Sequence, residues 1–370
     1  MTSPPFRADH VGSLLRPAAL LTARADRAAG RISPEELRSV EDTAIREVVA
    51  AQRAAGLSAA TDGEFRRTSW HMDFIYRLGG ISASDESIKV KFRNAAGGLE
   101  FTSAALRVDG PIRLTETVFA DDFAFLRDVA GDAITPKLTI PSPSMVHYRG
   151  GLAALDPNVY PDEEAFWADL SAAYAQQVAA VAELGCRYLQ LDDTSLAYLN
   201  DPAQRAELAA RGDDAEHQHL RYIRQINSAL AGRPESLRVT THMCRGNFRS
   251  SWAAEGGYDF VAEALFSELA VDGFFLEYDD PRSGSFAPLR FVPPGKMVVL
   301  GLVTTKRGEL ESKDDLKRRL DEAAKYVPIE QLCLSPQCGF SSTVEGNALT
   351  HDEQFAKLAL IVEVAQEVWG

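Results

Sequence analysis

The sequence predicts an α/β protein, a (β/α)8 TIM barrel with a β-hairpin inserted after the second strand. Short apolar runs alternate with longer segments of helical pattern, which predicts parallel strands joined by helices. The runs lie at residues 10–13, 58–62, 137–141, 188–192, 238–242, 274–277, 297–302 and 332–335. Eight strands close a barrel of this type, and a chain of 370 residues is long enough for one with insertions. We therefore predict a single domain over residues 1–370.

Helical patterns fill most of the intervals between these runs. Ser33 followed by Pro34 predicts a helix start, because serine caps helix N-termini and proline suits the first turn. Apolar residues recur three or four positions apart at residues 169–185, 216–232, 316–327 and 355–369. We expect the last of these helices to pack on the outside of the barrel and close it.

The interval between the second and third runs is too long for one crossover helix. Residues 81–120 contain the strand-like pieces IKVKF, EFTSAALRV and PIRLTETV around AAGG, which predicts a hairpin. An insertion after a barrel strand lies at the C-terminal end of the strands, where the active sites of such barrels are built. We expect the hairpin to cover a site there and to exclude water from it.

Composition and charge exclude several classes of function. The formal net charge of −14 would repel a nucleic-acid backbone, so we expect no nucleic-acid partner. The first residues lack the pattern of a secretory signal, and no run approaches the ~20 apolar residues that span a bilayer. Four cysteines in so long a chain are not a disulfide framework. We expect a cytoplasmic protein with free thiols and no membrane partner.

Four metal-binding residue types lie at or just past the ends of predicted strands. They are His242, Cys244, Glu277 and Cys338. Alternate residues of a strand share a face, so His242 and Cys244 project the same way, and strand ends converge above the core of a barrel. One imidazole, two thiols and one carboxylate suit the tetrahedral preference of zinc, and the sulfur ligands argue against magnesium or calcium. The sequence therefore predicts a zinc site.

The remaining cysteines and two neighbouring histidines fit structural roles. Cys186 and Cys333 each precede apolar strand residues, so we expect them to face packed interior as small hydrophobic side chains. His217 and His219 lie two positions apart in a polar helical stretch, where such positions point in different directions. We expect both histidines to be solvated.

Several motifs together resemble the catalytic domain of cobalamin-independent methionine synthase, in its short members with a single barrel. They are HxC at residues 242–244, LE at 276–277, PxCG at 336–339, VGS at 11–13, DGE at 62–64 and LQLDD at 189–193. The motifs span nearly the whole chain. The resemblance implies a zinc enzyme in which the activated thiol of homocysteine attacks the methyl group of methyltetrahydrofolate or another donor, giving methionine.

The same resemblance assigns residues to the amino-acid substrate. It implies that Glu64 and Asp192 hold the amino group of homocysteine, and that Ser13 contacts its carboxylate, with Val11 beside it. Both acids could instead cap helices or stabilise turns. We expect Asp193 to act in catalysis either by supporting the metal site from behind the ligands or by orienting one ligand, because a metal-bound histidine usually donates its other ring N–H to an acceptor.

The chain departs from the family pattern at two places. The family stacks its folate on a tryptophan, and the corresponding stretch KLTIPSPSMVHYRG has His147 or Tyr148 near that place. Trp70 could provide a platform from another loop. The histidine that the family places in a DxHS loop for proton transfer is also missing, and His71 and His147 are the candidates to replace it as catalytic residues.

Three hypotheses of function follow. The first is a zinc-dependent methyltransferase that makes methionine from homocysteine. The second is a related zinc-dependent thiol alkyltransferase with a different thiol acceptor or a donor other than a folate. The third is a metal-free barrel lyase or decarboxylase, or a carbon-acid binding protein, with structural cysteines. Zinc content separates the third hypothesis from the other two.

Overall fold

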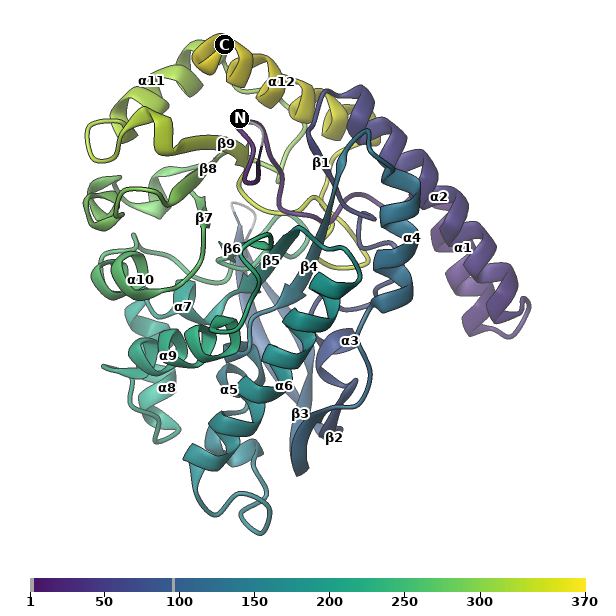
Figure 1. Ribbon diagram of the computed structural model, residues 1–370, viewed down its shortest axis with the longest axis vertical. Coiled ribbons are helices and arrows are strands. Elements are labelled where there is room, and N and C mark those ends of the chain that lie inside the picture. The colour runs from purple at the N-terminus through teal and green to yellow at the C-terminus, as the bar shows by residue number, and fades with distance from the viewer. Residues whose placement is uncertain (1–2, 95–96) are drawn as a thin grey trace.

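The computed structural model of the protein describes residues 3–94 and 97–370 and is built around one curled parallel sheet (Figure 1). Seven strands follow one another in chain order, and all neighbours are parallel. They are β1 (Ala59–Ala60), β4 (Thr135–Pro141), β5 (Tyr188–Asp193), β6 (Arg238–Met243), β7 (Gly273–Glu277), β8 (Met297–Val303) and β9 (Leu332–Pro336). The predicted parallel α/β sheet is therefore present.

The strand predicted at residues 10–13 is wrong. The only ladder contact of this N-terminal segment is an isolated parallel bridge from Ala8 to β9, among the described residues. The carbonyl of Val11 accepts a hydrogen bond from the side chain of Gln190 at 2.7 Å instead of from a neighbouring strand. Side-chain donors thus take the place of the sheet ladder here, and the sheet has seven regular strands rather than eight.

Helices cover the outer side of the curled sheet (Figure 1). The longer ones are α1 (Ala18–Ala28), α2 (Pro34–Ala54), α4 (Ala120–Ala130), α6 (Glu163–Glu183), α8 (Pro202–Ala210), α9 (Gln218–Leu230), α11 (Lys313–Ala323) and α12 (His351–Trp369). The shorter ones are α3 (Met72–Ile75), α5 (Ser144–Tyr148), α7 (Ser195–Tyr198), α10 (Ala262–Glu268) and the 3-10 turns η1 (Gly151–Ala154), η2 (Pro281–Ser283), η3 (Ala287–Phe291) and η4 (Ile329–Gln331). The helix start predicted at Ser33 is confirmed, because its hydroxyl accepts from the backbone N–H of Glu36 at 3.1 Å.

Between β1 and β4, the strands β2 (Leu78–Asn94) and β3 (Gly97–Leu114) form a separate antiparallel pair. Its far end lies against the loop after β6, where Arg93 and Trp252 exchange two backbone hydrogen bonds of 2.7 and 2.9 Å. The ring of Phe92 packs on Phe248 of the same loop at 5.4 Å between centroids. These contacts place the hairpin beside the loop that carries Cys244.

The structure tests the structural roles expected for the other cysteines and histidines. Cys186 and Cys333 are fully buried among apolar side chains, as predicted. His217 is exposed, as predicted, but the solvated position expected for His219 is wrong. His219 is buried with its ring 5.1 Å from that of Phe260, because α9 turns this face toward the neighbouring loop.

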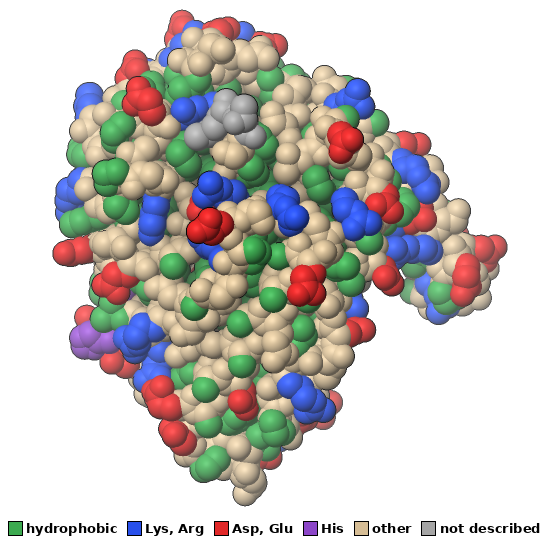
Figure 2. Space-filling view, in the orientation of Figure 1, with side chains coloured by type: hydrophobic (Ala, Val, Ile, Leu, Met, Phe, Trp, Pro, Cys, Tyr) green, Lys and Arg blue, Asp and Glu red, His purple; other side chains and the backbone are tan. Residues whose placement is uncertain are grey.

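The surface carries both signs of charge. On the face drawn in Figure 2, basic and acidic side chains are interspersed, and the basic ones do not form one continuous area. Within residues 3–94 and 97–370, no helix is both long enough and apolar enough to cross a bilayer.

Candidate metal centre and its cavity

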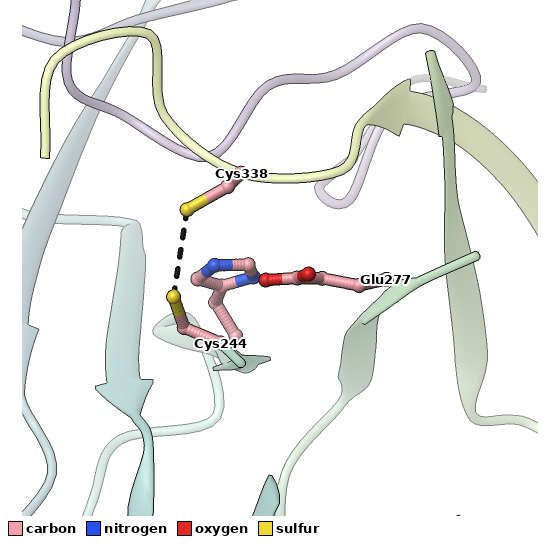
Figure 3. Close-up of side chains that lie close together, drawn as sticks. Cys244, Glu277 and Cys338 are labelled. Atoms are coloured by element: carbon pink, nitrogen blue, oxygen red, sulfur yellow. Dashed lines mark hydrogen bonds between the residues drawn. The ribbon is translucent and has the colours of Figure 1, made fainter. Parts of the chain in front are cut away.

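Four potential metal ligands from three separate strand ends lie close together (Figure 3). His242 is on β6, Cys244 follows that strand directly, Glu277 is the last residue of β7, and Cys338 lies just beyond β9. Their donor atoms all lie within 4.8 Å of one another, and all four side chains are buried. The two sulfur atoms are 3.5 Å apart. Residues separated by up to 96 positions thus meet at one point of the sheet edge.

Backbone contacts aim these side chains. The N–H of Cys244 donates to the carbonyl of Asp193 at 2.8 Å, which fixes the start of the loop after β6 against β5. The N–H of Arg245 donates to Oε1 of Glu277 at 2.9 Å, so the loop also holds the carboxylate. The backbone N–H of Glu277 in turn donates to the hydroxyl of Tyr258 at 2.9 Å.

The glycine of the PxCG motif is required by a close approach. A Cβ placed on Gly339 would lie 1.9 Å from Oγ of Ser13, well inside any real contact distance. The N–H of Phe340 also donates to the carbonyl of Ser13 at 2.9 Å. Glycine at position 339 therefore lets the segment at Ser13 lie directly beside Cys338.

The donor set fits a cation in its chemistry and in its unmet hydrogen bonds. Both ring nitrogens of His242 and Oε2 of Glu277 are buried without a hydrogen-bond partner among the described residues. Buried polar atoms normally have a hydrogen-bond partner, so these three atoms are suited to binding a cation. Two sulfurs, one nitrogen and one carboxylate oxygen are the ligand types of protein zinc sites.

The two thiols are electrostatically inequivalent. Contact with the Cys244 thiol, followed by the influence of His242, holds the pKa of Cys338 well below its usual value. The same contact and burial raise the pKa of Cys244 well above its usual value. One thiolate is therefore favoured in this pair, and placing a second one there needs a positive charge.

A cavity opens on this cluster. It is lined by three of the four ligand candidates and by all four residues predicted to bind the substrate: His242, Cys244, Cys338, Val11, Ser13, Glu64 and Asp192. Substrate-binding and metal-binding candidates from five different segments thus face one space.

The two acids of the cavity are buried. Oε1 of Glu64 accepts a hydrogen bond from the hydroxyl of Thr139 at 2.9 Å, and burial raises the pKa of Glu64. Burial also raises the pKa of Asp192 to about 7, and its Oδ1 accepts from Nε2 of Gln190 at 2.7 Å. Gly12 permits this arrangement, because with φ at 151° its absent Cβ would lie 2.9 Å from the Thr139 side chain. A cationic group entering the cavity would be stabilised by both carboxylates.

The chain as a whole matches known proteins. The family model described as the catalytic domain of cobalamin-independent synthase matches residues 6–367. The chain belongs to the cobalamin-independent methionine synthase family. The resemblance inferred from the motifs is therefore confirmed.

Relatives within the cobalamin-independent methionine synthase family match over most of their length. The uncharacterized Bacillus subtilis protein YxjH is 47% identical over 366 residues, which cover 99% of this chain and 95% of that protein. A methionine synthase of Pyrococcus abyssi is 25% identical, with 89% of this chain and 84% of the relative covered. A candidate vitamin-B12-independent methionine synthase of Listeria monocytogenes, known from a crystal structure, is 38% identical in sequence to this chain. The two structures superpose with a TM-score of 0.79 over 100% of this chain and 99% of the Listeria chain.

His71, one of the two predicted proton-transfer residues, lines the same cavity. Its Nδ1 lies 3.2 Å from the hydroxyl of Ser69, and its Nε2 is buried without a partner among the described residues. Burial and the charge of Arg149 lower the pKa of His71 to about 3, so the ring is neutral near pH 7. The ring of Trp70 lies against it at 4.5 Å and lines the cavity too.

The position of His147 argues against its predicted catalytic role. His147 is on α5, and it is not among the residues that line the metal cavity. Its Nδ1 lies 3.0 Å from the hydroxyl of Tyr222, and its ring packs on Trp167 at 5.0 Å. The helix α5 turns this side chain toward α6 and α9, away from the cluster, so His147 belongs to the core.

The side chain of Asp193 also has a different task from the one predicted. Its Oδ1 accepts from the hydroxyl of Ser195 and the N–H of Leu196, both at 2.8 Å. Its Oδ2 accepts from the hydroxyl of Ser144 at 2.7 Å. The carboxylate therefore ties α7 to α5, and Asp193 orients Cys244 only through its backbone carbonyl.

A pH dependence of stability follows from the burial of His147. Burial lowers the pKa of His147 to about 3, so the unfolded chain binds a proton that the folded chain rejects as the pH falls below ~6.5. The free energy of unfolding should thus rise with pH, and the stability from neutral His147 should be lost from about pH 6.5 downward. In urea unfolding between pH 5 and 6.5, His147→Gln should reduce this slope by up to about 1.4 kcal/mol per pH unit.

The exposed His217 is the matched control for this measurement. His217→Gln controls for the loss of one histidine, since its ring is exposed and lies 3.0 Å from Asp214. A slope that is the same in the His147 variant and in the wild type would contradict the burial argument.

Sequence analysis did not identify some of the residues that line the cavity. Arg149, Tyr198, Asn247, Phe92 and Phe101 line the cavity, but they lie in loops, short helices and the hairpin rather than at the ends of parallel strands. Periodicity fixes which face of a regular element is buried, and it gives no direction for a side chain that follows an irregular turn. Only the assembled structure brings these residues to the cobalamin-independent methionine synthase motifs.

Proposed function

We propose that this protein is a zinc-dependent methyltransferase that transfers a methyl group from methyltetrahydrofolate or another donor to homocysteine, giving methionine. The observation that carries the proposal is the convergence of four buried donor atoms within 4.8 Å, next to two buried carboxylates. His242, Cys244, Glu277 and Cys338 would hold the zinc. Bound zinc supplies a lowered thiol pKa, and thus a thiolate nucleophile at neutral pH.

The chain's own residues would bind and orient the amino acid. Glu64 and Asp192 would accept hydrogen bonds from the ammonium group, and the segment at Ser13 would contact the carboxylate. Asp192 and His242 are register partners on β5 and β6, so the ammonium site adjoins the metal site. A short amino-acid thiol held at Glu64 and Asp192 would therefore direct its sulfur toward the ligand cluster, which lowers the entropic cost of the reaction.

The hairpin would exclude water from the reacting atoms. The hairpin residues Val90, Phe92 and Phe101 place apolar side chains on the wall of the cavity. A dry cavity strengthens the interactions of the charged groups that remain and prevents loss of the methyl group to water.

We also propose that segment 8–14 holds the place of the first barrel strand, since Ala8 forms a parallel bridge to β9 and the N–H of Leu14 donates to the carbonyl of Gly63 after β1.

We propose His71 as the group that exchanges a proton with the methyl donor, because its unpartnered Nε2 lies at the cavity. His71→Phe keeps the ring that packs on Trp70 and removes both nitrogens. The variant should lower kcat about 100-fold, as expected for the loss of a general acid or base, and should retain its zinc. Steady-state kinetics across pH 5–9 with metal analysis would measure both effects.

His147→Gln is the control for the His71 variant, since His147 packs in the core. It should turn over at nearly the wild-type rate. A wild-type kcat in His71→Phe would remove His71 from the mechanism.

One observation favours the second hypothesis, an alkyltransferase with a donor other than a folate. The family's folate-stacking position is occupied by α5, whose His147 points into the core. Trp70 is the one tryptophan among the cavity-lining residues of the described chain. The donor site therefore differs in construction from a folate platform on this segment.

A single experiment tests the proposal and its alternatives. Zinc-loaded protein would be incubated with homocysteine or another thiol, and with a panel of methyl and alkyl donors, and products would be followed by mass. Methionine from homocysteine supports the first hypothesis, and product only from another thiol or an alkyl donor supports the second. Purified protein that binds no zinc would favour the third hypothesis and contradict the proposal.

A further inference from the structure

Arg149 lies at the boundary between the metal cavity and a second cavity. It follows α5 directly and lines both spaces, together with Val90 of the hairpin. The second cavity is lined by several cationic side chains. Its other lining residues are Lys89, Lys91, Tyr148, Gln204, Glu207, Leu208 and Arg211.

The charge of Arg149 is not neutralised within the protein. Among the residues that the structure describes, no carboxylate forms an ion pair with it, although it is half-buried. Its Nε is buried and lacks a hydrogen-bond partner within residues 3–94 and 97–370. The rings of Tyr148 and Tyr198 lie 5.9 and 5.7 Å from its Cζ and hold the guanidinium in place. A fixed, partly desolvated cation without a counter-ion is a site for an anion.

The other arginines near the metal cavity are already engaged. Arg67 donates to the hydroxyl of Thr139 at 3.0 Å and lies 3.7 Å from Glu64. Arg16 donates to the backbone carbonyls of Glu64 and Arg67 and to Ser341. Arg16 and Arg67 are not among the residues that line the metal cavity, whereas Arg149 is.

Arg149 is also separate from the carboxylates proposed to bind the amino acid. Arg149 follows α5, whereas Glu64 follows β1 and Asp192 is on β5. The apolar side chains Trp70, Phe92 and Phe101 line the cavity as well. An acceptor bound at Glu64 would leave the apolar wall and Arg149 for the second substrate.

We propose that Arg149 binds an anionic group of the methyl donor, whose apolar body lies against Trp70 and the hairpin aromatics. This inference rests on the proposed function, because it assigns a substrate class to the same cavity. The donor would be an amphipathic organic anion, with a carboxylate or similar oxyanion paired to the guanidinium. Arg149 would then act as a specificity-determining residue that rejects neutral donors of the same shape.

Fluorine NMR with a matched pair of probes tests this assignment. Zinc-loaded protein would be titrated with 4-fluorophenylacetate and with 4-fluorophenylacetamide, which share shape and differ in charge. We expect the anion to bind at least about tenfold more tightly than the amide, a typical gain for a charge-assisted pair. Arg149→Met should abolish the preference, and Arg149→Lys should retain part of it.

Lys89→Met is the control for a change of one charge at the rim, since Lys89 is exposed and paired with Glu100 at 2.8 Å. It should keep the wild-type preference. Equal binding of the two probes by the wild type, or a preference that survives in Arg149→Met, would overturn the inference. Displacement of the anionic probe by homocysteine would overturn the assignment to the donor, because it would place the acceptor's carboxylate at Arg149.

The probe titration also separates this inference from the proposed function. Zinc content and homocysteine binding of each variant would be measured in parallel, and Arg149→Met should keep both. Loss of the anion preference with intact zinc and homocysteine binding supports the assignment. Absence of zinc from the wild type would contradict the proposed function, and the comparison of the two probes would still decide whether Arg149 binds an anion.

Discussion

Cys338→Ala is expected to remove zinc from the protein and to abolish methyl transfer. The thiol of Cys338 lies 3.5 Å from that of Cys244, and its depressed pKa makes it the readier thiolate of the pair. Removing supporting contacts alone costs metal sites 10- to 100-fold in affinity, so loss of a ligand should weaken zinc binding by about 100-fold or more. Metal analysis after dialysis against a chelator, together with product formation, measures the effect.

Cys333→Ala is the matched control, because Cys333 lies on β9, the strand that leads to Cys338. Cys333 is equally buried, but burial raises its pKa to about 12 and its neighbours are apolar side chains. This variant should keep about one zinc per chain and lose only some stability, as expected for a small core truncation. Equal zinc contents in the two variants would contradict the ligand assignment.

Glu64→Gln is expected to raise the KM for homocysteine strongly while zinc stays bound. Hydrogen bonds to charged groups are worth about 1.5–3 kcal/mol, which corresponds to a rise of roughly 10- to 150-fold. Glutamine keeps the size of the side chain and can still bond to Thr139, whose hydroxyl lies 2.9 Å from the carboxylate. The measurement is the dependence of methionine formation on homocysteine concentration, with metal content determined on the same samples.

A glutamate remote from the cavity controls for the loss of one carboxylate. Glu41 on α2 is buried beside Arg24 and Arg66, and Asp42 remains to pair with Arg66 after its replacement. Glu41→Gln should leave the KM for homocysteine unchanged. An unchanged KM in Glu64→Gln would show that the ammonium group is bound elsewhere.

The two variants answer different questions. Loss of zinc in Cys338→Ala concerns the metal, and a raised KM in Glu64→Gln concerns the acceptor. A protein that loses zinc in Cys338→Ala but keeps its KM for homocysteine in Glu64→Gln would be a zinc enzyme that binds the ammonium group of homocysteine elsewhere.

Much of the site could be anticipated from regular elements. Alternation along β6 puts His242 and Cys244 on one side, and parallel strands bring their C-terminal ends to one edge. The structure accordingly brings these two residues near Glu277 and Cys338. The same alternation along β5 sends Asp192 toward the cavity and Asp193 to the opposite side, where its carboxylate meets Ser195. Strand periodicity therefore already argued against a ligand-orienting carboxylate at Asp193.

The sequence by itself determined the strand ends, the family and the residue types of the candidate metal centre, because each depends on local periodicity and short motifs. Tertiary structure alone decided that residues 10–13 leave the regular sheet, that His147 turns into the core, and that Arg149 reaches the cavity unpaired. These three outcomes depend on side chains that meet across distant segments, such as Gln190 bonding to Val11. No spacing within a single segment encodes such contacts, since the direction of a side chain after a turn is set by what packs against it.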